Sequence, residues 1–433
     1  MKKGFIVAAT HSGSGKTTIT LGILRALKNR GLLIGSAKAG PDFIDTVFHQ
    51  QSSGYDCFNL DPWAMREELI FTLARQQLKQ GLLIVEAMMG LFDGADNGKG
   101  SSADLAQLLG LPIVLVIDCT KQSHSVAATV CGFRDFKSGL FLAGVILNNL
   151  GSEHHSQIMH RAMSSIGITV FGSVMRNPTL RMSSRYLGLV QSEEYVDIES
   201  FLENAATIIE HSIHLDALLN LEISYCYPDG NAQSFISPGK KLVIARDRAF
   251  SFFYPHILNA LRKRNAQFSF FSPLANESPA LDADAVILPG GYPELYAEQL
   301  ASNHVFLQGL WDAVKRGAFV YGECGGYMVL GTFLIDSKGQ YHKMANLLPL
   351  ITSFEKKKLS LGYRVVKPLK QIPFLTDSNT HYTAHEFHYS TILEEGTTER
   401  LFDVADSRNR SLGKCGLRKG NVMGSYMHLI DQI

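Results

Sequence analysis

Short apolar runs alternate with stretches of helical period over the first half of the chain. Runs of strand length lie at residues 4–10, 32–37, 82–86, 113–118 and 142–147. Between them, residues 17–30 and 66–79 carry apolar residues at the spacing of an amphipathic helix. Strands that alternate with helices are typical of a parallel α/β sheet. We therefore predict such a sheet within residues 1–224.

The pattern changes between residues 225 and 240, where Pro, Gly, Asn and Ser replace the apolar periodicity. This composition predicts an interdomain linker. A second α/β pattern follows, with strands expected at 241–245, 267–271, 285–288 and 318–321 and helices expected at 253–263 and 306–315. The rest of the chain is richer in Thr, His and Gly and predicts mixed strands and loops. The sequence thus predicts two α/β domains, 1–224 and 241–433, joined by a linker at 225–240.

Composition narrows the class of protein. A chain of 433 residues with 45 % hydrophobic and 19 % charged residues is typical of soluble globular domains. Because 41 basic residues nearly balance 40 acidic ones, we expect no nucleic-acid partner and no attraction to an anionic membrane. No apolar run reaches the roughly 18–20 residues that a transmembrane helix needs. Six scattered cysteines without a C-x-x-C pair favour a cytoplasmic protein without a disulfide framework.

A candidate phosphate-binding loop, Thr10-His11-Ser12-Gly13-Ser14-Gly15-Lys16-Thr17, lies between the first predicted strand and the first predicted helix. This is the context that a P-loop requires, since glycines turn backbone N–H groups toward phosphate oxygens at a helix N-terminus. The usual first glycine is Thr10 here, as in the variant loops of the dethiobiotin synthetase and MinD-like group. A glycine-rich turn without a ligand is the alternative. The expected ATP-binding residues are Ser12, Gly13, Ser14, Gly15, Lys16, Thr17, Thr18 and Asn148.

Magnesium requires oxygen ligands near the phosphates, and several acids follow predicted strands. Glu86 closes an apolar run, while Asp45 and Asp93 lie in the loops Gly-Pro-Asp-Phe-Ile-Asp and Gly-Leu-Phe-Asp-Gly. Ligands of open parallel sheets collect at the carboxyl ends of the strands. We therefore expect a metal site formed by Thr17, Asp45, Glu86 and Asp93. Asp118 is a weaker alternative, and each acid could instead cap a helix or form a turn.

The second half contains a candidate thiol nucleophile. Cys324 lies in Gly-Glu-Cys-Gly-Gly, after an apolar strand and before a helical stretch, which is the pattern of a nucleophile elbow. Gly290 and Gly291 follow another strand and, with Gly325, could supply the N–H groups of an oxyanion hole. A buried structural cysteine is the alternative for Cys324.

A thiol nucleophile needs a base, and His428 near the C-terminus is the first candidate. His385 and His388 are its competitors. An ordinary buried histidine remains the alternative for His428.

These motifs resemble the cobyrinic acid a,c-diamide synthases of the CobB/CbiA type along essentially the whole chain. The segments that carry the resemblance are 10–18, 38–45, 59–63, 86–94, 187–190, 246–255, 271–274, 288–294, 323–326 and 385–390. The resemblance implies a dethiobiotin-synthetase-like P-loop domain followed by a class I glutamine amidotransferase domain. It also implies Mg²⁺, with ATP and L-glutamine as co-substrates, a corrinoid substrate and a role in cobalamin biosynthesis.

By the same resemblance, Cys324 attacks the glutamine amide and His428 raises its nucleophilicity. ATP phosphorylates an acetate carboxylate of cobyrinic or hydrogenobyrinic acid, and ammonia then displaces phosphate, at the a and c side chains in turn. The segment 42–63 is expected to face the substrate. A homodimer is left open.

The chain departs from related proteins at two positions. Many class I amidotransferases carry His-x-Glu, but Ile430 stands two residues after His428, so a Cys–His dyad is expected. Tyr186 stands where this family often has His.

Other functions remain as alternatives. The related enzymes are nickel-sirohydrochlorin a,c-diamide synthase and cobyric acid synthase. An alternative of another class is a MinD-like nucleotide-binding scaffold with an inactive amidotransferase domain. His11 at the position of the MinD signature lysine, and the retained Cys324, argue against that alternative.

Overall fold

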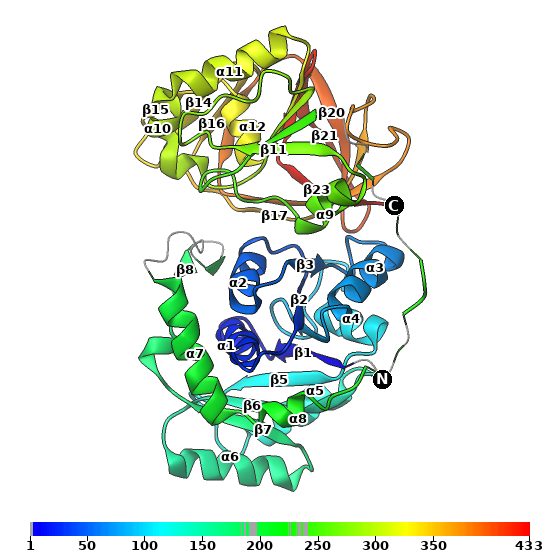
Figure 1. Ribbon diagram of the computed structural model, residues 1–433, viewed down its shortest axis with the longest axis vertical. Coiled ribbons are helices and arrows are strands. Elements are labelled where there is room, and N and C mark those ends of the chain that lie inside the picture. Colours follow the sequence, from blue (N-terminus) through cyan, green and yellow to red (C-terminus); the bar gives the residue numbers. More distant parts are fainter. Residues whose placement is uncertain are drawn as a thin grey trace. The chain divides into compact units, whose positions relative to one another are not determined.

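The computed structural model describes residues 3–182, 184–185, 188–189, 197–223, 225, 227–230, 232, 235–236 and 241–433. It consists of two compact units, Met1–Ala232 and Gln233–Ile433, which Figure 1 shows in sequence colours. Tyr186, parts of the family segment 187–190 and parts of the expected linker 225–240 lie outside the described residues.

The first unit contains a seven-stranded parallel sheet in the order β3-β2-β4-β1-β5-β6-β7. Its strands are β1 (Gly4–Ala9), β2 (Ile34–Ala39), β3 (Cys57–Leu60), β4 (Leu82–Glu86), β5 (Ile113–Asp118), β6 (Leu142–Leu150) and β7 (Val170–Met175). Its helices are α1 (Lys16–Asn29), α2 (Ile44–Ser53), α3 (Glu67–Leu78), α4 (Ser102–Leu109), α5 (Val126–Asp135), α6 (Glu153–Ser165), α7 (Ile198–Ser212) and α8 (Leu215–Leu218). A short antiparallel pair, β8 (Ser184–Arg185) and β9 (Gly188–Leu189), and a 3₁₀ turn at Pro178–Leu180 complete the described elements.

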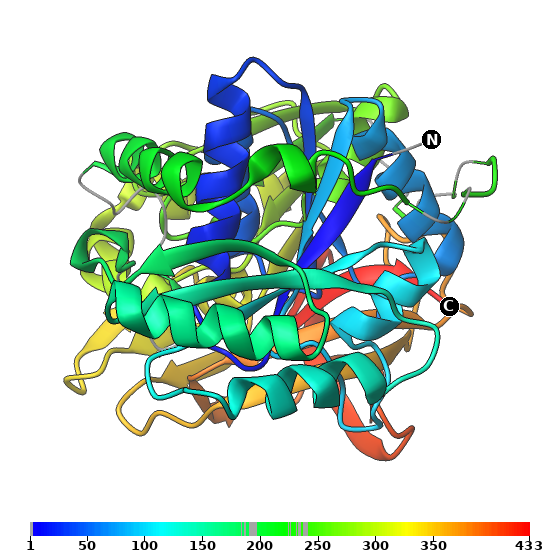
Figure 2. The same ribbon diagram turned by 90° about the horizontal axis from the view of Figure 1, so that it is seen from below.

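Helices cover both faces of this sheet, as Figures 1 and 2 show. All six residues of β1 are buried, which explains why this strand is a continuous apolar run rather than an alternating one. On one face, Ile19 and Ile23 of α1 pack with Ile209 of α7 and Leu215 of α8 into the main core. The parallel sheet expected from the sequence is confirmed.

The boundaries of the first-unit strands differ from expectation in instructive places. The run expected at 32–37 is displaced by two residues, because Leu32 and Leu33 are exposed and the strand continues to Ala39 through the buried Lys38. Neither β3 nor β7 was predicted. β3 has only four residues, and Gly172 and Ser173 break the apolar run of β7.

The second unit is built on a ten-stranded mixed sheet in the order β11-β10-β12-β13-β22-β21-β20-β17-β18-β23. Its strands are β10 (Lys241–Ala245), β11 (Gln267–Phe271), β12 (Ala285–Leu288), β13 (Phe319–Glu323), β17 (Ser360–Pro368), β18 (Tyr382–His388), β20 (Glu399–Asp406), β21 (Ser411–Lys419), β22 (Val422–Ser425) and β23 (Met427–Gln432). The strands from β11 to β22 run parallel, and those from β22 to β23 pair antiparallel.

A smaller sheet and four helices accompany it. The smaller sheet, ordered β15-β14-β16-β19, contains β14 (Phe333–Ile335), β15 (Tyr341–Lys343), β16 (Leu350–Ser353) and β19 (Thr391–Glu395). The helices are α9 (Pro255–Lys263), α10 (Ala297–Ser302), α11 (His304–Lys315) and α12 (Gly325–Leu330), and a 3₁₀ turn, η3, spans Pro293–Tyr296. The strands expected at 241–245, 267–271 and 285–288 are confirmed residue for residue, and the one expected at 318–321 begins at Phe319 and ends at Glu323.

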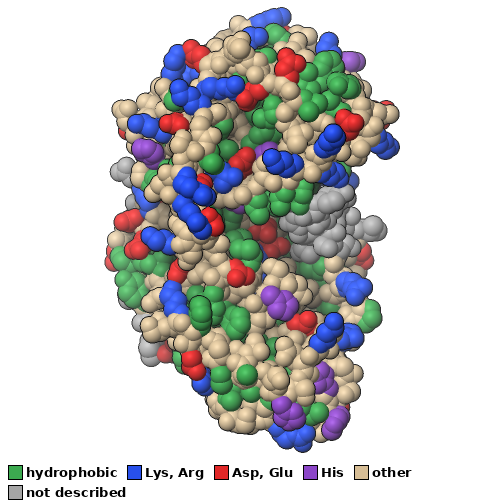
Figure 3. Space-filling view, turned by 180° about the vertical axis from the view of Figure 1, so that it is seen from behind, with side chains coloured by type: hydrophobic (Ala, Val, Ile, Leu, Met, Phe, Trp, Pro, Cys, Tyr) green, Lys and Arg blue, Asp and Glu red, His purple; other side chains and the backbone are tan. Residues whose placement is uncertain are grey.

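The charge distribution on the surface and the apolar character of the helices are relevant to nucleic-acid and membrane partners. Figure 3 shows basic and acidic side chains interspersed on the visible face, without one large patch of a single sign. Among the helices of the described residues, none combines the length and the apolar character needed to cross a membrane.

Candidate functional site

The phosphate-binding loop connects β1 to α1 with the backbone that its glycines allow. Gly13 has φ +84° and Gly15 has φ +85°, values that favour glycine, and α1 begins at Lys16 directly after Gly15. Ser14 donates a hydrogen bond from Oγ to the carbonyl oxygen of His11 at 2.8 Å. Asn148 at the end of β6 donates from Nδ2 to the carbonyl oxygen of Ser14 at 2.9 Å. These two hydrogen bonds fix the shape of the loop.

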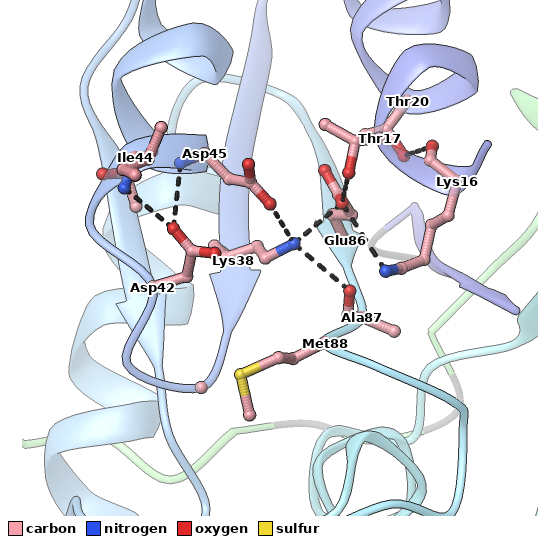
Figure 4. A network of polar contacts seen from close by, with 12 residues as sticks. Lys16, Thr17, Thr20, Lys38, Asp42, Ile44, Asp45, Glu86, Ala87 and Met88 are labelled. Carbon is pink, nitrogen blue, oxygen red and sulfur yellow. Dashed lines mark hydrogen bonds and ion pairs between the residues drawn. The ribbon is translucent and has the colours of Figure 1, made fainter. Parts of the chain in front are cut away.

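Glu86, the last residue of β4, is the centre of the polar network in Figure 4. Its Oε1 accepts hydrogen bonds from Thr17 Oγ1 at 2.5 Å and from Lys38 Nζ at 2.7 Å. Its Oε2 lies 2.7 Å from His49 Nε2, and Lys16 Nζ lies 3.8 Å from Oε1. The fully buried carboxylate of Glu86 thus contacts Lys16 and Thr17 of the P-loop. It also contacts Lys38 and His49.

The charges in this network support one another. Burial alone would raise the pKa of Glu86, but Lys38, His49 and Lys16 hold it well below its usual range. Burial likewise opposes the charge on Lys38, yet the neighbouring Asp45 and Glu86 raise its pKa. For Lys16, burial and the nearby Lys38 lower the pKa. A ligand that brings negative charge to Lys16 would reverse the effect on that residue.

The expected metal ligands are partly brought together. Thr17 and Glu86 are adjacent, and Asp45 reaches the same place through Lys38, whose Nζ lies 2.5 Å from Asp45 Oδ2. Asp93 instead accepts a hydrogen bond from the N–H of Gly90 at 2.8 Å, in its own turn. Within the described residues, no group of three or more His, Cys, Asp or Glu side chains is arranged to hold a metal ion. The oxygens of Thr17 and Glu86 nevertheless suit Mg²⁺, which takes one or two protein ligands and completes its shell with phosphate and water.

The other candidates of the first unit have local partners. Asp118 accepts hydrogen bonds from Thr120 and from the side chain of Asn149. Thr18 donates from Oγ1 to the carbonyl oxygen of Leu180 at 3.3 Å, while Ser12 is exposed in the loop.

Lys38 and His49 did not stand out as individual site residues in the sequence. A lysine inside an otherwise apolar strand was the available signal for Lys38. His49 lies on α2 with no spacing that points to Glu86, because the contact depends on the tertiary fold.

In the second unit, Cys324 occupies a sharp turn between β13 and α12. Its φ of +48° and ψ of −102° are strained for a residue with a side chain. Gly326 makes the turn feasible, because an added Cβ there would lie 1.9 Å from the carbonyl oxygen of Leu288. The N–H of Cys324 donates to the carbonyl oxygen of Ser425 at 2.8 Å, which ties the elbow to β22. The nucleophile elbow expected from the sequence is thus present in the backbone.

His428 and Cys324 both pack against Gly290. A Cβ added to Gly290 would lie 2.3 Å from His428 Cε1, 3.1 Å from His428 Nε2 and 3.4 Å from Cys324 Cβ. Gly325 and Gly291 are also neighbours, since a Cβ on Gly325 would lie 3.1 Å from the nitrogen of Gly291. Cys324, the imidazole of His428 and the expected oxyanion-hole glycines are therefore close together.

The competing histidines lie nearby in other roles. His385 of β18 is paired directly opposite His428 of β23. His388 stacks on Tyr426, with ring centroids 3.6 Å apart, and its Nε2 lies 3.1 Å from Glu386 Oε1. The ring of His428, in contrast, packs against Gly290 beside Cys324.

Electrostatics keeps the resting site neutral. Burial, with help from Glu294, raises the pKa of the Cys324 thiol. Burial, with His385 and His388, lowers the pKa of His428 to about 3. Both shifts favour the uncharged forms of the thiol and the imidazole.

Comparison with known proteins finds one family match in each of the two units. Residues 5–189 match the CobQ/CobB/MinD/ParA nucleotide binding domain, and residues 241–432 match the CobB/CobQ-like glutamine amidotransferase domain. The hydrogenobyrinate a,c-diamide synthase of Brucella abortus biovar 1 (strain 9-941) is 52% identical over 433 residues, which cover 99% of this chain and 98% of that protein. The chain belongs to the hydrogenobyrinate a,c-diamide synthase family.

Two further relatives of this family are similarly close in extent. The hydrogenobyrinate a,c-diamide synthase of Rhizobium meliloti (strain 1021) is 48% identical, with 99% of both chains covered. That of Mesorhizobium japonicum (strain LMG 29417 / CECT 9101 / MAFF 303099) is 43% identical, with 99% of this chain and 98% of that protein covered. Membership of the family confirms the resemblance noted in the sequence. It also confirms that the chain is an enzyme with a nucleotide-binding domain and a glutamine amidotransferase domain.

Proposed function

We propose that this protein converts the a and c acetate carboxylates of hydrogenobyrinate into amides, with ATP, Mg²⁺ and glutamine, as a step of cobalamin biosynthesis. The observation that carries the proposal is one chain with both a Glu86-centred phosphate loop and a Cys324 elbow opposite His428. The relatives are named hydrogenobyrinate a,c-diamide synthase, which supports the choice of substrate.

In the first unit, the residues must make a carboxylate reactive. A carboxylate is a poor acyl donor, and a mixed anhydride with phosphate turns one oxygen into a good leaving group. Lys16 and the N–H groups of the loop would bind the phosphates and stabilise the charge of the transferring group. Thr17 and Glu86 would hold Mg²⁺, which when bound neutralises phosphate charge. Lys38 forms ion pairs with both Glu86 and Asp45 and holds these side chains in place.

In the second unit, the residues must release ammonia. The Sγ of Cys324 attacks the side-chain amide carbon of glutamine, and the proton of the thiol passes to Nε2 of His428. The N–H groups near Gly291 and Gly325 stabilise the oxyanion. His428 then returns the proton to the leaving nitrogen, which departs as ammonia and leaves a thioester. Water hydrolyses the thioester to glutamate and restores the thiol.

The location follows from the same chemistry. We place the reaction in the cytoplasm, where ATP and glutamine are supplied. The cysteines of the described residues are free thiols, which suits a reducing compartment.

The decisive experiment offers the purified protein hydrogenobyrinate, cobyrinate or nickel-sirohydrochlorin with ATP, Mg²⁺ and glutamine, and follows the products by mass spectrometry. We expect two successive amidations of hydrogenobyrinate. Preference for nickel-sirohydrochlorin would assign the protein to that related reaction. Absence of glutamate release with every substrate would contradict catalysis and favour the nucleotide-binding scaffold.

A further inference from the structure

A buried acid lies close to His428, the residue proposed as the base for Cys324. Glu323 precedes Cys324 directly and is the last residue of β13. Its Oε2 lies 3.9 Å from Nδ1 of His428, whose side chain is almost completely buried. A Cβ added to Gly290 would lie 3.1 Å from Nε2 of the same ring and 3.4 Å from Cys324 Cβ. The imidazole therefore lies near both Cys324 and a carboxyl group.

This placement results from the order of the strands. Glu323 of β13 pairs with Ser425 of β22, and the chain then turns at Tyr426 into β23, which carries His428. The N–H of Leu429, the residue after His428, also points at Glu323 Oε1 at 3.5 Å. The carboxyl group thus meets β23 at two successive residues.

We propose that Glu323 positions His428, by receiving the Nδ1–H of the imidazole so that Nε2 is unprotonated and can take the proton of Cys324. The proposal rests on the glutaminase role of this site. Glu323 would take the place of the acid that is missing two residues after His428, where Ile430 stands.

Several features agree with a positioning role. A carboxylate on Nδ1 fixes the tautomer that leaves Nε2 unprotonated, and it stabilises the imidazolium formed when the thiol proton arrives. The gap of 3.9 Å is longer than a hydrogen bond, but catalytic hydrogen bonds are often long before substrate binds. A carboxyl group buried beside the nucleophile is costly unless it is used or paired.

Several ionisable groups lie near His428 and Cys324, so the pH dependence due to Glu323 must be separated from theirs. Burial raises the pKa of Glu323 to about 8, while the N–H of Leu429 and Tyr321 oppose that rise. His385, His388 and Glu386 of β18 and Glu294 of η3 also act on His428 or Cys324. Ionisation of Glu323 would therefore add a rising limb to the rate near pH 8, and only a change at Glu323 should remove it.

The test is Glu323→Gln in the full chain, with Glu394→Gln as the control. Glu394 lies at an exposed position of β19, so the control makes the same substitution on the surface. For Glu323→Gln we expect kcat for glutamine hydrolysis to fall about 10- to 100-fold, with KM for glutamine within about 3-fold, because the amide can donate to Nδ1 and cannot become negative. Glu394→Gln should stay within about 3-fold of the unmodified protein.

Three readouts distinguish positioning from damage to the fold. Amidation with ammonia should be unchanged in Glu323→Gln, and the rising limb of rate near pH 8 should disappear. Alkylation of Cys324 by iodoacetamide should slow in Glu323→Gln and in His428→Asn, and the double variant should be no slower than His428→Asn. If Glu323→Gln does not fold, Glu323→Asp provides the comparison, with a smaller loss expected because the acid is kept but shortened.

The proposal is overturned if folded Glu323→Gln keeps kcat within 3-fold, or if its effect adds fully to that of His428→Asn. Loss of ammonia-dependent amidation in the unmodified protein would instead contradict the proposed function, because that reaction belongs to the first unit and does not need Glu323.

Discussion

Asn148 holds the phosphate-binding loop through a hydrogen bond from its side-chain nitrogen to the carbonyl oxygen of Ser14, 2.9 Å away. The contact is possible because Gly15 has no side chain. A Cβ at Gly15 would lie 2.2 Å from Nδ2 of Asn148. The amide at the end of β6 and the loop after β1 therefore depend on each other for their shape.

Replacing this glycine should weaken nucleotide binding. We expect Gly15→Ala to raise the KM for ATP at least 10-fold, because the new methyl group displaces Asn148 in addition to straining a backbone at φ +85°. Gly13→Ala is the matched control, since Gly13 has φ +84° but no atom within 4 Å of the added Cβ. Both variants carry similar backbone strain, so ATP titrations that show equal losses would contradict the role of the clash.

The buried network around Glu86 predicts an asymmetric effect on stability. Lys38→Met should lower the free energy of unfolding of the first unit by about 3–5 kcal/mol, because it leaves the carboxylates of Asp45 and Glu86 without their shared cation. Lys79→Met, on the exposed end of α3, should change it by less than about 0.5 kcal/mol. Urea titrations of both variants measure this difference. Equal stability of the two would show that the network does not need Lys38.

The same network shows what the sequence could and could not reveal. Continuous apolar runs predicted β4 and β5 with their observed ends, because these strands are buried on both faces. The buried Lys38 concealed the end of β2, since a charged residue within a strand has the pattern of a loop. Its partners become visible only when β2 and β4 are placed side by side.

The second unit gives a parallel case. Cys324 was found from its glycine-rich elbow, which is a local pattern, and His428 was found as a histidine near the C-terminus. Glu323 was overlooked because a search for the acid at His-x-Glu spacing ends at Ile430. Its approach to His428 depends on the pairing of β13 with β22 and on the turn into β23. Such a contact between distant segments has no signature in local spacing.

The division of labour predicts a separation by nitrogen source. Cys324→Ser should abolish glutamine-dependent amidation and leave ammonia-dependent amidation intact, because the thiol serves only to release ammonia. Lys16→Ala should lose both activities, since the phosphate binding proposed for Lys16 is needed whichever nitrogen source is used. Product formation is measured by mass spectrometry with glutamine or ammonium chloride. Equal loss of both activities in Cys324→Ser would refute the separation.

The stability of the second unit should depend on pH through Glu323. Burial raises the pKa of this carboxyl group to about 8 in the folded protein, from an ordinary value of 4.5. Between these values the folded state keeps a proton that the unfolded state releases, so the free energy of unfolding falls as pH rises. The slope is at most about 1.4 kcal/mol per pH unit.

Glu323→Gln removes this titration and provides the control. His428, with a folded pKa lowered to about 3, acts in the opposite sense, since its contribution is lost as pH falls below about 6.5. That effect is common to both proteins and cancels in their difference. Calorimetry from pH 5 to 8 should therefore show the unmodified protein losing stability relative to Glu323→Gln as pH rises. A constant difference would mean that Glu323 is ionised throughout. Since the proposed positioning of His428 needs the ionised acid, pH should change glutaminase rate and stability in opposite directions.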